Sequence, residues 1–189
     1  EDLGGALDDL EWTVSAYTLT FAVLLMFGAA LGDRFGRRRL YAAGLIGFAA
    51  ASAAAALSPS VEALIAARAV QGIAAAFMMS LGLALLSAAF PPERRGTAIG
   101  LFSAVTGIAV ASGPLVGGAV VNGLDWTWIF WGNVPIALVG APLVLARVKE
   151  SYGPRTAFDF PGLGLVTAGA FGLVWGLVRG NEVGWGSVE

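Results

Sequence analysis

The stretch Gly28-Ala-Ala-Leu-Gly-Asp33-Arg34-Phe-Gly36-Arg37-Arg38-Arg39-Leu40 lies between two long apolar runs and carries four arginines within six residues. An arginine at the centre of a bilayer costs roughly 2.5–3.5 kcal/mol on insertion scales. Four of them keep this stretch outside the hydrocarbon, while the runs on either side are free to enter it. Gly32 and Gly36 allow a tight turn here, and Asp33 is able to pair with a neighbouring arginine.

The composition is typical of a membrane protein. Of the 189 residues, 57% are hydrophobic and 13% are charged, and the mean hydropathy is +0.78. A soluble domain carries about 25% charged residues. Cysteine and histidine are both absent, which removes thiol chemistry and the commonest metal ligand and general base. We therefore expect no enzyme, no metal site and no cofactor.

Six apolar runs are long enough to be membrane spans, since a helix needs about 20 residues to cross a bilayer. They cover residues 13–31, 40–57, 61–90, 97–124, 126–146 and 160–178. The connections between them are short and hold Pro, Gly, Ser or charge, so neighbouring spans are expected to be antiparallel. The predicted fold class is an all-α polytopic membrane protein.

The basic residues predict the orientation, because loops rich in Lys and Arg lie preferentially in the cytoplasm. We therefore place the 32–39 loop in the cytoplasm and residues 1–12 outside. Nine of the 11 basic residues then fall on the cytoplasmic side: Arg34, Arg37, Arg38, Arg39, Arg94, Arg95, Arg147, Lys149 and Arg155. The chain opens on an acidic segment without an initiator Met, so we interpret it as an excerpt that starts in a loop.

Arg68 is the charged residue that lies deepest in a predicted span, about six residues or roughly 9 Å from the outer start of its run. A charge at that depth needs a partner, a cavity or a route by which it snorkels to the headgroups. Gln71 shares its helix face, and Gly72 allows another helix to approach closely. In the first run, Tyr17 and Thr20 could line a cavity or simply join two helices.

Residues 107–118 read Gly-Ile-Ala-Val-Ala-Ser-Gly-Pro-Leu-Val-Gly-Gly. Gly113 and Gly117 form a GxxxG pair, and Pro114 removes a backbone donor inside the predicted helix. A bent helix with small side chains is suited either to ordinary close packing against another helix or to a pivot between moving parts of the protein.

Three strings together resemble the major facilitator superfamily of transporters. Asp33-Arg-x-Gly-Arg-Arg-Arg is similar to its signature loop, with Ala29 where the family usually has Gly, and Leu64-x-x-x-Arg68-x-x-Gln71-Gly72 is similar to its second signature. The string from Gly113 to Gly118, with Gly107 before it, resembles the antiporter signature of proton-driven drug exporters. Further strings, beginning at Glu11 and at Phe158, are similar to the 14-helix branch, of which this chain would cover helices two to seven.

The resemblance implies proton-coupled multidrug efflux by alternating access, across the cytoplasmic membrane of a bacterium. The expected roles are a cytoplasmic gate for Asp33, Arg34, Gly36, Arg37 and Arg38, proton coupling for Arg68, Gln71 and Gly72, and a pivot and proton seal for Gly107, Gly113, Pro114, Gly117 and Gly118. The expected organisation is a partial N-terminal transporter half (1–146), a cytoplasmic loop (147–159) and an extra central helix (160–189). Thr127 stands where the family usually has Arg.

The expected partners are the lipid bilayer, protons, an amphipathic small molecule, and the first helix and C-terminal half of a longer parent chain; no nucleic acid is expected. No carboxylate is buried within a predicted span, so the proton-binding group is expected outside this chain. Three alternatives stay open: export of another metabolite, siderophore or amino acid, a non-transporting sensor on the same fold, and an arginine loop that only sets topology.

Overall fold

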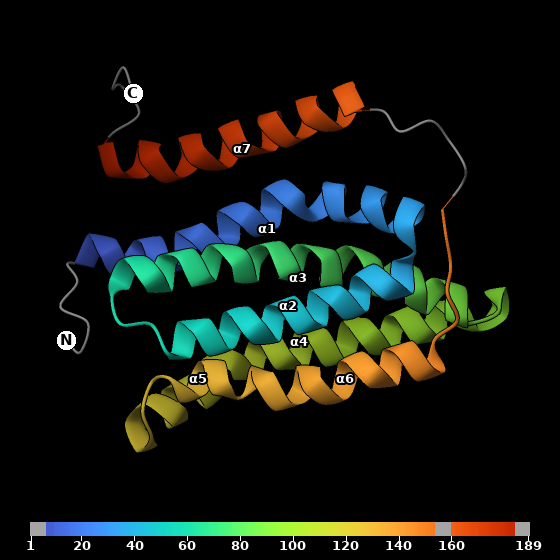
Figure 1. Cartoon of the computed structure of the whole chain (residues 1–189), viewed down its shortest axis with the longest axis horizontal. Helices are drawn as coiled ribbons and strands as arrows, with labels where there is room; N and C mark the ends of the chain where they lie inside the picture. Colours follow the sequence, from blue (N-terminus) through green and yellow to red (C-terminus); the bar gives the residue numbers. More distant parts are fainter. Residues whose placement is uncertain (1–6, 154–159, 184–189) are drawn as a thin grey trace.

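The computed structural model describes residues 7–153 and 160–183, and every regular element within those ranges is an α-helix (Figure 1). The helices are α1 (Leu7–Phe35), α2 (Arg37–Ala56), α3 (Val61–Ala89), α4 (Pro92–Gly123), α5 (Trp128–Trp131), α6 (Asn133–Arg147) and α7 (Phe160–Val183). The long helices lie alongside one another and alternate in direction, as their short connections require. The predicted all-α bundle is confirmed.

Five stretches in the described ranges are long and apolar enough to cross a membrane: Glu11–Phe35, Arg37–Ala56, Val61–Ala89, Pro92–Gly123 and Trp128–Arg147. They coincide with the first five predicted spans, and the fifth combines α5 with α6. The sixth predicted span falls on α7, whose apolar part, Gly164–Leu177, is shorter.

The turn between α1 and α2 differs from the loop that the sequence predicts over residues 32–39. Helix α1 continues to Phe35 and α2 starts at Arg37, so that Gly36 alone separates them. Gly36 has a φ of 106°, a left-handed conformation that glycine adopts at little cost. Hydropathy marks the point at which a helix leaves the hydrocarbon, whereas the backbone hydrogen bonds let the helix continue beyond it. Gly32 belongs to α1 and is therefore not part of the turn, and a Cβ placed on it would overlap the Leu81 side chain of α3.

Helices α2 and α3 form the centre of the bundle, with α1 packed on α3 and α6 packed on α2 (Figure 1). The core is built mainly from alanine. Leu45 and Ala49 of α2, for example, pack on Ala137 and Ala141 of α6. Small residues allow backbones to approach closely, which is how helices associate in a solvent as apolar as themselves.

Helices α4 and α7 lie at the periphery of the described bundle. Helix α7 packs on α1, where the Trp12 and Trp175 rings are 5.8 Å apart. Helix α4 contacts α3 and α5, and none of its side chains is buried. One whole side of α4 is therefore uncovered by any other described residue.

Candidate functional site

Arg68 lies on α3 and directs its guanidinium toward α1. Its Nε donates to the backbone oxygen of Thr13 at 3.1 Å, and its Nη1 donates to Gln71 Oε1 at 2.7 Å. The contact with Gln71 follows from their spacing of three residues, which places both side chains on one helix face. The arginine is therefore held by contacts within the bundle.

Gln71 continues this network to a third helix. Its side chain is 1% exposed, and Nε2 donates to the Oγ of Ser52 on α2 at 2.6 Å. Ser52 is itself completely buried. Sequence reasoning missed Ser52, although it is an isolated hydroxyl within a run of alanines, which is the one signal that could have identified it. The resulting chain of contacts joins α1, α3 and α2.

Tyr17 completes what we call the Arg68 network (Thr13, Tyr17, Ser52, Arg68 and Gln71). The Arg68 guanidinium carbon lies 4.2 Å from the centre of the Tyr17 ring, a cation–π contact. Each partner found for Arg68 within residues 7–153 and 160–183 is neutral. A positive charge is thus fixed inside a membrane span without a described carboxylate beside it.

Thr20 and Gly72 lie at the contact between α1 and α3. The Thr20 hydroxyl is 2.9 Å from the backbone oxygen of Ala69, and a Cβ placed on Gly72 would overlap Thr20 Oγ1 and the Tyr17 carbonyl. This geometry favours the role of Thr20 in joining helices over the alternative of lining a cavity. It also accounts for glycine at position 72.

The stability of the Arg68 network depends on Gln71. We expect Gln71→Leu to lower the free energy of unfolding by about 1–3 kcal/mol, because it leaves buried polar groups on Ser52 and Arg68 without partners. Thermal unfolding of the detergent-purified protein measures this loss. Ser52→Ala is the matched variant: it orphans only one amide hydrogen and should cost less. Equal stability of Gln71→Leu and wild type would contradict the prediction.

The second cluster is the basic turn, which we define as residues 33–39. Arg37 Nε pairs with Asp33 Oδ1 at 2.7 Å, one helical turn away across Gly36. Arg34 is exposed in the last turn of α1, with its guanidinium 5.7 Å from the centre of the Phe35 ring. The local ion pair that the sequence suggested for Asp33 is therefore present.

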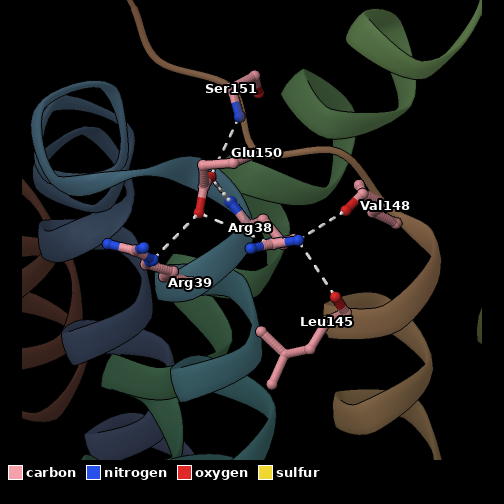
Figure 2. Close-up of polar contacts among 6 residues, drawn as sticks. All are labelled: Arg38, Arg39, Leu145, Val148, Glu150 and Ser151. Atoms are coloured by element: carbon pink, nitrogen blue, oxygen red, sulfur yellow. Dashed lines mark hydrogen bonds and ion pairs between the residues drawn. The ribbon is translucent and has the colours of Figure 1, made fainter.

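Glu150, which sequence reasoning missed, joins the basic turn from the segment after α6 (Figure 2). Its Oε1 accepts from the backbone N–H of Arg38 at 2.8 Å, and its Oε2 lies 3.7 Å from the Nε atoms of both Arg38 and Arg39. The Arg38 side chain in turn donates to the backbone oxygens of Leu145 and Val148, each at 3.2 Å. An arginine at these carbonyls complements the negative end of α6.

The predicted antiporter residues all lie on α4, which runs unbroken through Pro114. A Cβ placed on Gly113 or Gly117 would meet no other described residue within 4 Å, and the same holds for Gly107 and Gly118. The structure therefore brings neither the Arg68 network nor the basic turn to these glycines, and their face is open.

A bundle of membrane-length helices with a buried arginine network defines a multi-pass α-helical membrane protein. Residues 1–188 match the family model of the Major Facilitator Superfamily. The chain belongs to this superfamily, whose members are transporters and not enzymes.

Curated relatives cover nearly the whole chain. The tetracenomycin C resistance and export protein of Streptomyces glaucescens is 39% identical over an alignment of 192 positions, which covers 100% of this chain and 36% of that protein. The probable actinorhodin transporter of Streptomyces coelicolor is 41% identical, covering 97% of this chain and 33% of its own length. The multidrug resistance protein Stp of Mycobacterium tuberculosis is 39% identical, with 96% and 34% covered. The chain spans about a third of the length of these relatives.

A solved structure shares the fold. A crystal structure of the peptide transporter POT, a mutant in complex with sulfate, matches with a TM-score of 0.66 and 19% identity. The match covers 98% of this chain and 40% of that one. At this identity the likeness concerns the arrangement of helices alone.

Proposed function

We propose that this chain is part of a proton-coupled exporter of amphipathic drugs in the cytoplasmic membrane of a bacterium. Relatives that are 39–41% identical carry names that describe resistance, export or transport. The observation that carries the proposal is the Arg68 network, because a positive charge is placed inside a span and fixed there by neutral groups.

Such a charge suits proton coupling for an electrostatic reason. A nearby positive charge favours the ionised form of a carboxylate and disfavours a second cation. When a proton neutralises a carboxylate close to Arg68, the attraction between the two groups is lost and the balance between two conformations changes. We propose that this carboxylate belongs to a part of the transporter outside these 189 residues.

The basic turn is proposed as a gate on the cytoplasmic side, with residues 1–12 on the outer side. The positive-inside bias supports this orientation. The Asp33–Arg37 pair has side chains that are 38% and 20% exposed, respectively. Partly exposed ion pairs contribute little free energy, so such a pair is able to open and close during alternating access.

The open glycine face of α4 is proposed as the pivot and proton seal. A Cβ placed on Gly107, Gly113, Gly117 or Gly118 would meet no other described residue within 4 Å, and Pro114 is exposed, which leaves room for a helix from the remainder of the transporter. A helix packed on Gly113 and Gly117 would come close enough to exclude water between the two.

A bulky residue on this face tests the pivot. In the full-length transporter we expect Gly113→Leu to lower the rate of transport at least tenfold at unchanged expression, because the added side chain occupies the space of the incoming helix. The control is Gly100→Leu on the same helix, where a Cβ also meets nothing described. The rate of dye transport in vesicles measures both. Equal activity of the two variants would remove the special role of Gly113.

The function itself is tested with full-length transporter in inverted membrane vesicles. A cationic dye should accumulate when the vesicle interior is acidified, and a protonophore should abolish the accumulation. Accumulation that ignores the protonophore would contradict proton coupling. Absence of any dye movement would contradict drug export for those dyes and favour another exported metabolite or a non-transporting role.

A further inference from the structure

The start of α2 lacks the features that normally stabilise a helix N-terminus. Its first three residues are Arg37, Arg38 and Arg39, and no acidic residue lies in its first turn. The N-cap residue, Gly36, has no side chain with which to accept a hydrogen bond. Positive charges are unfavourable at this end of a helix, because the backbone dipoles already make it positive.

Glu150, which is 112 residues from Arg38 in the sequence, supplies both the missing hydrogen-bond acceptor and the missing negative charge. Its Oε1 accepts from the Arg38 N–H at 2.8 Å, which is what a capping side chain would do. Its Oε2 lies within 4 Å of two guanidinium groups, and its side chain is only 15% exposed. The carboxylate thus offsets the positive end of α2 and two of its three arginines.

Gly36 makes room for this contact. A Cβ built on Gly36 would lie 2.9 Å from the carboxyl carbon of Glu150. The glycine is therefore required for its backbone conformation and also for the approach of Glu150.

The segment around Glu150 is also bonded to the basic turn through its backbone. Arg37 N–H donates to the Ser151 oxygen, and Gly153 N–H donates to the Asp33 oxygen, each at 3.0 Å. Arg38 is bonded to the end of α6 (Figure 2), so together these contacts tie the ends of α1, α2 and α6 to one another.

We propose that Glu150 is a positioning residue of the cytoplasmic gate: it caps α2 and couples the basic turn to the segment that leaves α6. This proposal rests on the proposed function of the basic turn as a gate. Arg68 is near the start of α3 and Glu150 follows the end of α6, and these two helix ends lie at opposite ends of the bundle (Figure 1). Loss of Glu150 should therefore affect the rate of the conformational change and not the binding of substrate.

The experiment compares wild type, Glu150→Ala and Glu150→Gln in the full-length transporter. The control is Glu93→Gln, which removes an exposed carboxylate in the first turn of α4 at the same end of the bundle. Hydrogen–deuterium exchange of residues 37–42 reports on the cap, and dye transport gives KM and the maximal rate. We expect Glu150→Ala to speed exchange at least tenfold and to lower the maximal rate at least fivefold, with KM within twofold of wild type. Glu150→Gln keeps an acceptor oxygen, so its exchange should stay within threefold of wild type.

Exchange in Glu150→Ala that matches the Glu93→Gln control would overturn the proposal, as would faster exchange with an unchanged maximal rate. If Glu150→Ala does not fold, Glu150→Gln is used for the test. We expect Glu150→Gln to keep the cap and to lower the maximal rate. A maximal rate equal to that of wild type would overturn the proposal. If the wild type moves no dye, the proposed function fails, yet the exchange measurement alone still decides whether Glu150 anchors the basic turn.

Discussion

Replacing Arg68 by alanine is expected to reduce proton-driven dye accumulation at least tenfold, to the level of vesicles without transporter. The guanidinium donates to two groups on different helices and lies against Tyr17. Alanine removes the charge and leaves Gln71, which is 1% exposed, with an unpaired oxygen. Initial rates in inverted vesicles at matched expression measure the effect.

Comparison of Arg68→Lys with Arg68→Ala separates charge from geometry at this position, and a variant elsewhere serves as the control. Arg68→Lys keeps the charge, but its single ammonium does not reproduce the planar fork that reaches Thr13 and Gln71 together. We expect it to retain a fraction of the activity. Arg147→Ala removes an exposed arginine from the end of α6 and should behave as wild type. Full activity of Arg68→Ala would mean that the arginine plays no part in coupling.

Addition of a methyl group at Gly72 is expected to destabilise the bundle strongly. A Cβ at this position would overlap Thr20 Oγ1 and the Tyr17 carbonyl oxygen, and would lie 3.1 Å from the Tyr17 carbonyl carbon. Overpacking of this kind costs about 1–3 kcal/mol, and backbone atoms are poorly able to move aside. Thermal unfolding in detergent should show a clear loss for Gly72→Ala, and Gly72→Leu should prevent folding.

Gly47→Ala is the matched control on α2. Its Cβ would lie 3.7 Å from the Ala74 Cβ, an ordinary van der Waals contact. Since alanine is a better helix former than glycine by about 1 kcal/mol, this variant should be as stable as wild type or more so. If Gly72→Ala and Gly47→Ala shift the unfolding temperature equally, then α1 and α3 do not approach each other as closely as described.

Much of the fold is predictable from the order of apolar and charged residues. The spans follow from the lengths of the apolar runs, because the composition of a segment alone indicates whether it prefers water or hydrocarbon. The family follows from the strings around Asp33, Arg68 and Gly113, and the match over residues 1–188 confirms it. The roles assigned to those residues stay predictions.

The contacts of the site were less predictable. The pairing of Arg68 with Gln71 follows from a spacing of three residues on one helix. Ser52 is 19 residues from Gln71, and Glu150 is 112 residues from Arg38, so no local pattern connects either pair. A tight turn at Gly36 was expected, but the ends of α1 and α2 directly beside it were missed, because hydropathy does not show where a helix ends in water.

The sequence by itself therefore determined which segments enter the membrane and that an arginine lies inside one of them. These properties depend on local composition, which a transfer free energy describes segment by segment. Only the tertiary structure decided which neutral groups hold Arg68 and which carboxylate caps α2. These contacts depend on how closely distant segments approach one another. Because they have no side chain, Gly72 allows α1 to approach α3 and Gly36 allows Glu150 to approach α2.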